Sequence, residues 1–170
     1  MSVVPLVRDA RPEDLPGIVR VFLDCWRISY AAALPAELVA RVTDESAHDL
    51  WTRALASDAS HTIVATAADA HIAGVASYRL TPGEDDPYDG YVASLYVDPA
   101  TQGTGIGRLL LSTAEAGLRD AGATSASLWV FADNAPSVRF YARQGWSPDG
   151  ESVTLSEWGQ PQVRLAKNLT

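Results

Sequence analysis

The chain has 170 residues, of which 47% are hydrophobic and 20% are charged. These values are ordinary for a globular protein with one full hydrophobic core, so we expect a single domain over residues 1–170. The formal net charge of −8 repels phosphate backbones and argues against a nucleic-acid partner. The single cysteine excludes an internal disulfide, and no apolar run reaches the roughly 18 residues of a membrane helix. We therefore expect a cytoplasmic protein with no membrane partner.

The first third of the chain is predicted to form one short strand and then helices. Residues 6–9 are predicted as the strand. Apolar residues between positions 15 and 26 then recur at helical spacing, which predicts a helix with one buried face. Asp14 is predicted as its N-cap, and Cys25 on its apolar face is interpreted as a small buried hydrophobe. Two further helices are predicted over residues 35–42 and 45–56, the second capped by Thr43 or Asp44.

The rest of the chain alternates strands and helices. Strands are predicted over residues 61–67, 71–80, 91–97, 126–131, 152–155 and 162–167, and helices over 136–144 and from a start within 105–109. Trp129, Trp146 and Trp158 are interpreted as packing residues. The break at residues 68–70 suits a hairpin, and Gly122 and Gly145 suit helix C-termini. The order β-α-α-α-β-β-β-α-β-α-β-β is typical of a mixed α/β domain, and the segment from Tyr91 to Phe131 has the length of a parallel crossover.

The most informative stretch of the sequence runs from Leu95 to Leu110. A predicted strand enters it, glycines follow at positions 103, 105 and 107, and an amphipathic helix leaves it. Glycines let the amides at a helix start approach an anion, and the helix dipole favours negative charge there by about 0.3–1 kcal/mol. The stretch lacks the lysine of a P-loop, and its third glycine comes one residue too early for the dinucleotide fingerprint. A phosphate site of another kind and a plain tight turn both remain open.

The spacing Gln-x-x-Gly-x-Gly, formed by Gln102, Gly105 and Gly107, resembles the pyrophosphate motif of the GNAT acetyltransferase family. Downstream, Asn134 follows a predicted strand and Tyr141 comes seven residues later, which is similar in order and spacing to the later GNAT signature. The resemblance covers residues 91–146. It implies the GNAT (acyl-CoA N-acyltransferase) fold, an α/β fold with a mixed, mostly antiparallel central sheet of about six to seven strands flanked by helices.

The same resemblance implies acetyl-CoA as co-substrate and no metal. In this fold two neighbouring strands diverge, and the pantetheine arm of CoA pairs with strand backbone as an added strand would. For Asn134, an N-cap role before Pro136 is an open alternative. The residues that the resemblance assigns to acetyl-CoA are Leu95, Tyr96, Val97, Gln102, Gly103, Thr104, Gly105, Ile106, Gly107, Arg108, Asn134 and Tyr141.

The implied reaction is direct attack of a primary amine on the acetyl thioester in a ternary complex. An alkylamine with a pKa near ~10.4 must first lose a proton. The resemblance assigns two catalytic roles: the backbone N–H of Val97 stabilises the developing oxyanion, and Tyr141 protonates the leaving thiolate. The alternative for Tyr141 is a packing residue of the core.

The sequence departs from the family pattern at the general base. Many members carry a glutamate on the strand before the loop, and here that position is Tyr91. The substitute that the sequence offers is a water chain that relays the proton through backbone carbonyls, through Ser94 or through an acid of the preceding loop such as Asp89. The missing glutamate also favours a rival interpretation, a catalytically silent GNAT-fold module that binds acyl-CoA as a sensor or interaction domain.

The acceptor side is the least determined part of the sequence. In the GNAT fold the first two helices line the acceptor pocket, so Trp26 and Tyr30 are expected to contact the amine, together with Tyr91 and Asp89. Core packing is the alternative for Trp26 and Tyr30. The acidic loop of residues 84–89 is either a solvated surface or a lip that attracts a cationic amine. The acceptor is a small-molecule amine or a protein or peptide amine, and a homodimer is expected from the family.

Overall fold

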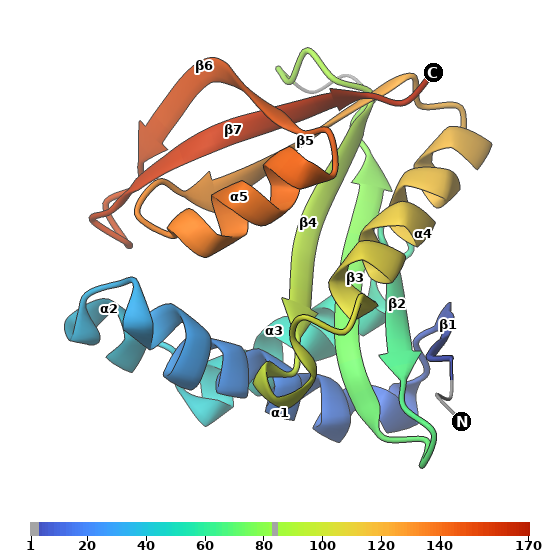
Figure 1. The fold of residues 1–170 in the computed structure, drawn as a ribbon, viewed down its shortest axis with the longest axis vertical. Helices are drawn as coiled ribbons and strands as arrows, with labels where there is room; N and C mark the ends of the chain where they lie inside the picture. Colours follow the sequence, from blue (N-terminus) through green and yellow to red (C-terminus); the bar gives the residue numbers. More distant parts are fainter. Residues whose placement is uncertain (1–3, 83–84) are drawn as a thin grey trace.

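Seven strands form one continuous sheet in the computed structural model, which describes residues 4–82 and 85–170 (Figure 1). The strands are β1 (Leu6–Asp9), β2 (His61–Thr66), β3 (Ile72–Leu80), β4 (Gly90–Val97), β5 (Ser125–Phe131), β6 (Ser147–Thr154) and β7 (Pro161–Asn168). They lie in the order β1-β2-β3-β4-β5-β7-β6. Every neighbouring pair is antiparallel except β4 and β5. The mixed, mostly antiparallel sheet that the sequence predicts is confirmed.

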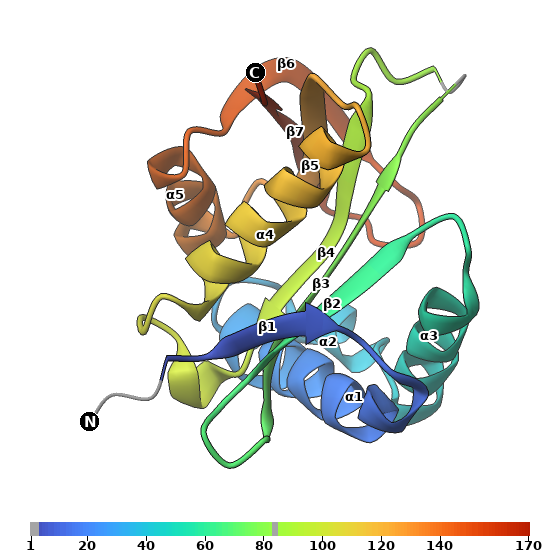
Figure 2. The same cartoon turned by 90° about the vertical axis from the view of Figure 1, so that its right-hand side faces the viewer.

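Helices cover both faces of this sheet. They are α1 (Leu15–Asp24), α2 (Ala36–Ala40), α3 (Asp44–Ala56), α4 (Ile106–Asp120) and α5 (Ala135–Arg143), with the short turns η1 (Pro12–Asp14), η2 (Cys25–Ser29), η3 (Tyr30–Ala32) and η4 (Pro99–Thr101). Figure 2 shows α4 and α5 on one side of the strands and α1 and α3 on the other. Because α4 joins β4 to its parallel neighbour β5, the predicted crossover is confirmed. Within the described residues, no helix is long and apolar enough to span a bilayer.

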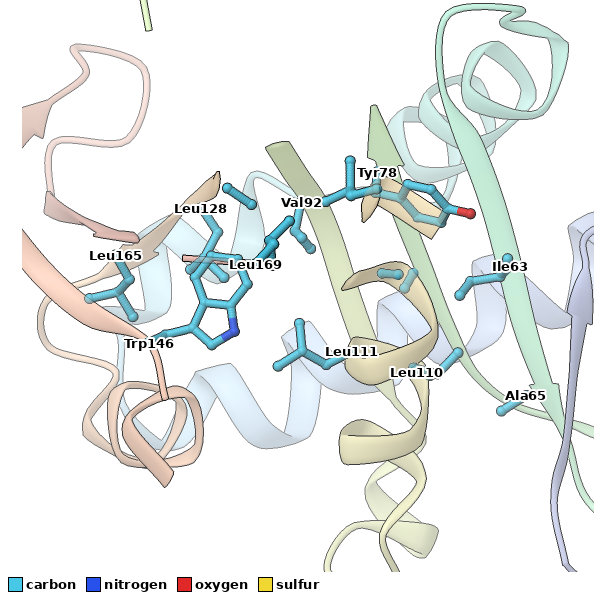
Figure 3. Packing of buried hydrophobic residues seen from close by; sticks show 14 of the residues in the cluster. Ile63, Ala65, Tyr78, Val92, Leu110, Leu111, Leu128, Trp146, Leu165 and Leu169 are labelled. Carbon is cyan, nitrogen blue, oxygen red and sulfur yellow. The ribbon is translucent and has the colours of Figure 1, made fainter. Parts of the chain in front are cut away.

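Each face of the sheet has its own hydrophobic core. On the α4 side, Leu110 and Leu111 pack with Ile63, Leu128 and Trp146 (Figure 3). Burying a leucine side chain of this kind stabilises the fold by about 1.5–3 kcal/mol. The core on the opposite side is formed mainly by α1, α3 and the central strands, with Ile18, Val21, Phe22, Trp26, Trp51, Val64 and Val75 among its buried residues.

The first helix differs from its prediction at both ends. Asp14 stands at the predicted N-cap position of α1, but its side chain accepts no amide of that helix, because its carboxylate accepts the Arg11 N–H at 2.7 Å and the Arg8 guanidinium at 2.7 and 2.9 Å. The carboxylate therefore stabilises the 3₁₀ turn η1, which precedes α1. At its C-terminus α1 continues into η2, a π-helical turn in which the Tyr30 N–H bonds to the Cys25 carbonyl. The cap of α3 is Thr43, one of the two predicted candidates.

The strands β4 and β5 stay paired at only two positions, and the last of these places Tyr91 opposite Ser127. Beyond this point they diverge, although β4 continues to Val97. An extra residue of β4, Ala93, interrupts the register with β3 and forms a bulge, which bends a strand and increases its twist. The divergence that the resemblance implies is therefore present, and along the second half of β4 it leaves the side that faces β5 without a paired strand, while the other side stays paired with β3.

Candidate active site

A cavity of about 760 Å³ lies where β4 and β5 diverge. Its walls come from both faces of the sheet, because Trp26 and Tyr30 line it from the α1 side and Gly107 and Tyr141 from the side of α4 and α5. The cavity thus passes between the two strands, and its volume is typical of a small-molecule site. We call the part beside α4 and α5 the loop half. The aromatic half is the part walled by Trp26, Tyr30, Tyr96, Phe131 and Trp158.

The glycine loop before α4 borders the loop half. Gly103 and Gly105 have φ angles of +81° and +93°, and a side chain at either position would begin in open space, with no atom within 4 Å of its Cβ. The first hydrogen bond of α4 runs from the Leu109 N–H to the Gly105 carbonyl at 3.0 Å. The amides ahead of Leu109 have no acceptor within the helix, so they are available to an anion. At Gly107 a Cβ would lie 3.3 Å from the Phe140 ring, so this glycine allows α4 and α5 to approach.

Two arginines add positive charge at the rim of the loop half. Arg108 follows the glycines on α4, and Arg143 ends α5. Both side chains are exposed and both line the cavity. In a chain of net charge −8, this pair beside a helix N-terminus favours a phosphorylated ligand.

Asp98 fixes the start of the loop. Its carboxylate accepts the Ala100 N–H at 2.9 Å and the Arg20 guanidinium at 3.0 Å, and the Thr101 N–H bonds to its carbonyl at 2.8 Å. Burial acts to raise the pKa of Asp98, but the Ala100 N–H and the Arg20 guanidinium outweigh it and hold the pKa below its usual value. Asp98 is therefore charged at neutral pH and joins the loop to α1.

The peptide groups of Val97 are turned toward the gap between the strands. The Asp98 N–H bonds to the Ala73 carbonyl of β3 at 2.9 Å, and neighbouring residues of a strand direct their polar groups to opposite sides. The Val97 N–H and C=O therefore face away from β3. The carbonyl accepts the Cys25 thiol at 2.9 Å and the Gln102 side chain at 3.2 Å.

Gln102 connects the loop to the π-helical turn η2. Its Nε2 donates to the Ser29 hydroxyl at 3.0 Å as well as to the Val97 carbonyl. The glutamine of the predicted phosphate motif thus holds the protein's own backbone in position. It joins the loop half to the wall of the aromatic half.

Helix α5 brings Asn134 and Tyr141 to the cavity. Asn134 is buried and caps α5, with its Oδ1 accepting the Ser137 N–H at 3.4 Å, and its side chain also lines the cavity. Tyr141 lines the cavity and lies 5.1 Å from Phe140, between ring centroids. Burial, reinforced by the nearby Tyr96 hydroxyl, raises the pKa of Tyr141. This phenol is protonated at neutral pH, so it can give a proton but cannot take one.

The aromatic half is a set of touching rings centred on Trp26. The Trp26 ring lies 4.8 Å from Tyr30 and 5.7 Å from Trp158, between centroids. Phe131 lies 6.1 Å from both tryptophans, and Tyr96 lies 6.1 Å from Tyr30. Burial is the main cause that raises the pKa of Tyr30 and of Tyr96. Both hydroxyls are therefore neutral at physiological pH.

Asp89, predicted to contact the amine or to relay its proton, does not line the cavity. Its carboxylate accepts the N–H and the hydroxyl of Thr124 at 2.9 and 2.6 Å, and these bonds, the hydroxyl first, lower the pKa of Asp89. The structure thus corrects this expectation, because the carboxylate holds the turn that enters β5. Tyr91 and Ser94, by contrast, line the cavity.

Other residues that the sequence assigned to the site also do not line the cavity. The Ile106 side chain is buried in the core on the α4 side, and the Thr104 hydroxyl donates to the Thr101 carbonyl. These two residues can therefore offer a ligand only their backbone groups. In the acidic loop, Asp86 accepts the Ser127 hydroxyl at 3.0 Å, and Glu84 lies outside the described residues. No residue that is described and lines the cavity carries a carboxylate.

The sequence did not reveal several residues that line this cavity. Trp158, interpreted as packing, comes from the irregular connection between β6 and β7, where no periodicity marks it. Cys25 was assigned to the core, and it is buried, but its thiol reaches the Val97 carbonyl. Arg143 carried a usable signal, since it follows Tyr141 by two residues in the last turn of a predicted helix.

Comparison with known proteins places this chain in one family. Residues 17–146 match the family model described as acetyltransferase (GNAT) family. Over 144 residues the chain is 31% identical to the uncharacterized N-acetyltransferase YuaI of Bacillus subtilis, covering 84% of this chain and 79% of that one. It is also 30% identical to the aminoglycoside N(6')-acetyltransferase type 1 of Stenotrophomonas maltophilia, covering 72% of each chain. The chain therefore belongs to the GNAT acetyltransferase family.

Solved structures of other acetyltransferases share this fold. The crystal structure of the PaiA N-acetyltransferase from Thermoplasma acidophilum, in complex with coenzyme A, matches with a TM-score of 0.75. The match covers 98% of this chain and 99% of that one at 19% identity, so it bears on the fold alone. The family match and the two N-acetyltransferase relatives identify the protein as a GNAT-family acyltransferase.

Proposed function

We propose that this acyltransferase transfers an acetyl group from acetyl-CoA to a primary amine, by direct attack within a ternary complex. The observation that carries the proposal is the cavity that passes between the diverging strands β4 and β5 beside the free amides of α4. A passage through the sheet lets two substrates meet from opposite faces. The aminoglycoside acetyltransferase name of one relative and the coenzyme A in the PaiA crystal are consistent with such a pair of substrates.

The loop half fits the polar parts of acetyl-CoA. In this proposal the amides around Gly105 and Gly107 bind the pyrophosphate, with Arg108 and Arg143 adding charge at the rim. The pantetheine arm carries amide groups, and the backbone of Leu95 and Val97, which faces the gap, is suited to pair with them as an added strand would. The buried Asn134 side chain is placed along the same path.

Acetyl-CoA supplies an activated thioester, and the protein's own groups act on the charges that develop. The Val97 N–H would donate to the thioester oxygen as negative charge builds there. The Cys25 thiol and the Gln102 amide hold the carbonyl of the same residue, which belongs to the next peptide group, so the backbone that follows this N–H is held in place before substrate arrives. Tyr141, protonated at neutral pH, would give its proton to the departing thiolate.

Ser94 is the predicted proton relay that lines the cavity. A hydroxyl with no carboxylate beside it is a poor base, so it would act by positioning water that carries the proton away. The structure therefore offers good groups for the oxyanion and the thiolate, and a weak one for the proton of the amine.

Release of CoA thiol over a panel of primary amines tests this function. The panel should contain an aminoglycoside, amino acids, a peptide with a free N-terminus, alkylamines and arylamines. We expect acetyl-CoA to bind by calorimetry and at least one amine to release CoA. If acetyl-CoA binds and no amine releases CoA, the silent binding module predicted as the rival is the better description. If acetyl-CoA does not bind, the site assignment itself is wrong.

A further inference from the structure

The aromatic half of the cavity presents almost nothing but rings and neutral donors to a ligand. Five rings wall it and contact one another with centroid distances between 4.8 and 6.1 Å, those of Trp26, Tyr30, Tyr96, Phe131 and Trp158. Rings of this kind bury apolar area and favour flat aromatic ligands, which stack on them or meet their edges. The shape and chemistry of this half are therefore those of an aromatic binding site.

The charge of the cavity is confined to the loop half. Its described lining residues include no carboxylate and no imidazole, and the charged ones are Arg108 and Arg143, both on the side of α4 and α5. Four further titratable groups of the lining are neutral near pH 7, because burial raises the pKa of the Cys25 thiol to about 12 and raises the pKa values of Tyr30, Tyr96 and Tyr141. No described side chain in the aromatic half carries a negative charge to pair with an ammonium ion, and none is a base that takes its proton near pH 7.

The Trp26 indole adds a feature that an apolar ligand alone would not satisfy. Trp26 is 4% exposed, and its Nε1 is buried without a hydrogen-bond partner among the described residues. It lies near the Tyr96 hydroxyl, whose pKa it helps to lower against the larger effect of burial, but the geometry is not that of a hydrogen bond. Trp26 lines the cavity, and a buried N–H left unpaired is costly, so a ligand oxygen that reaches Nε1 through a small shift of the indole ring would be favoured.

We propose that the acceptor is a primary arylamine that enters the aromatic half uncharged and carries on its ring an oxygen that accepts a hydrogen bond from Trp26 Nε1. The inference rests on the proposed function and names its substrate class. An alkylamine with a pKa near 10.4 is neutral in only about one molecule in 2,500 at pH 7, so it needs a base to become reactive. The nitrogen of an arylamine is already unprotonated. Cation–π attraction would hold an ammonium ion here, but it would leave that ion protonated and unreactive.

The reaction balances without a strong base. The amine nitrogen forms a bond to the acetyl carbon, and the bond from that carbon to sulfur breaks. Tyr141 gives its proton to the leaving sulfur and regains one from the nitrogen, through water if needed, as the amide forms. One arylamine and one acetyl thioester give one N-aryl acetamide and one CoA thiol.

A pair of amines that differ by one methylene tests the charge argument. We expect 4-methoxyaniline to show a kcat/KM at pH 7 at least about tenfold above that of 4-methoxybenzylamine, because the second amine is protonated there. The kcat/KM of the aniline should be flat between about pH 6.5 and 9, whereas that of the benzylamine should rise about tenfold per pH unit. A benzylamine that matches or exceeds the aniline at pH 7 overturns the proposal.

Two tryptophan variants test the indole donor. Trp26→Phe keeps a ring and removes the N–H, so the preference for 4-methoxyaniline over 4-methylaniline should fall about fivefold while the KM for acetyl-CoA stays unchanged. Trp51→Phe is the matched control, because the Trp51 Nε1 is also buried and has no partner in the described part of the chain, but this residue does not line the cavity. An unchanged preference in Trp26→Phe, or an equal fall in Trp51→Phe, overturns the role of the indole.

The outcomes separate this inference from the proposed function. CoA release with alkylamines and none with arylamines overturns the arylamine class and leaves the acetyltransferase intact. Binding of acetyl-CoA with release on no amine overturns both.

Discussion

The loop half and the aromatic half of the cavity are built in different ways. The loop half is made mostly by the contiguous segment from Val97 to Arg108, and it offers backbone amides. The aromatic half is made by side chains from opposite ends of the chain, such as Trp26 in η2 and Trp158 between β6 and β7. A backbone site depends on local conformation, and a side-chain site depends on which elements the fold brings together. The first kind can be shared across a family, and the second can differ in every member.

The largest effect should come from filling the loop half. Gly105→Glu places a side chain and a negative charge among the amides of α4, so acetyl-CoA affinity should fall at least about 100-fold, or about 2.8 kcal/mol, by calorimetry. Gly105 also has a φ of +93°, and a residue other than glycine in that region costs about 1–2 kcal/mol of stability.

Gly150→Glu separates these two effects. Gly150 has a φ of +97° and equally open surroundings, but it lies in β6 away from the cavity. The two variants should lose similar stability, and only Gly105→Glu should lose acetyl-CoA. Unchanged affinity in Gly105→Glu would contradict the assignment of the loop.

The second largest effect is expected from Tyr141, which lines the cavity. Tyr141→Phe should lower kcat about 100-fold, because the thiolate then leaves without a proton, and acetyl-CoA affinity should stay within about twofold. Because burial raises the pKa of Tyr141, the parent should show no alkaline fall in kcat below about pH 10.

The control for this variant is Tyr88→Phe, which removes a hydroxyl that donates to Asp149 outside the cavity. It should leave kcat unchanged. If Tyr141→Phe lowers the melting temperature and leaves kcat intact, the packing role is the correct one.

The smallest effect concerns the anchor of the loop half. Asp98→Asn keeps an oxygen for the Ala100 N–H and loses the charge that pairs with Arg20, so the free energy of unfolding at pH 7 should fall by about 1 kcal/mol. Because the folded pKa of Asp98 is lowered, this contribution is present above the unfolded pKa of about 3.9 and is lost as pH falls through the folded value. Urea unfolding at pH 7, 5 and 3 should show the difference between parent and variant closing at the acid end.

Asp24→Asn is the matched control, since Asp24 contacts the same arginine at 3.5 Å from a side chain that is 41% exposed. An exposed pair of this kind contributes at most about 0.5 kcal/mol. A loss as large as that of Asp98→Asn would mean that the loop is not anchored through Asp98.

The sequence predicted the order of elements and the glycine loop because both are local properties. Hydrophobic spacing marks strands and helices, and the motif from Gln102 to Gly107 lies within one turn of the chain. The spacing could not show that Gln102 would bond to Ser29, or that α1 would widen into a π-turn at Cys25, because these depend on packing between distant segments. The prediction that Asp89 reaches the amine was wrong for the same reason. Its carboxylate bonds to Thr124, which is 35 positions away in the sequence and comes close only when the sheet has formed.

The buried thiol of Cys25 has a practical consequence for the assays. Its pKa of about 12 leaves only about one molecule in ten thousand as thiolate at pH 8, and the thiolate is the form that reacts with disulfide reagents. Cys25 is the one cysteine of the chain, so a colorimetric thiol reagent would register released CoA and not the folded enzyme. The same reagent, used without substrates, would react only when η2 separates from the end of β4, and the rate of that reaction would report how often the two halves of the cavity come apart.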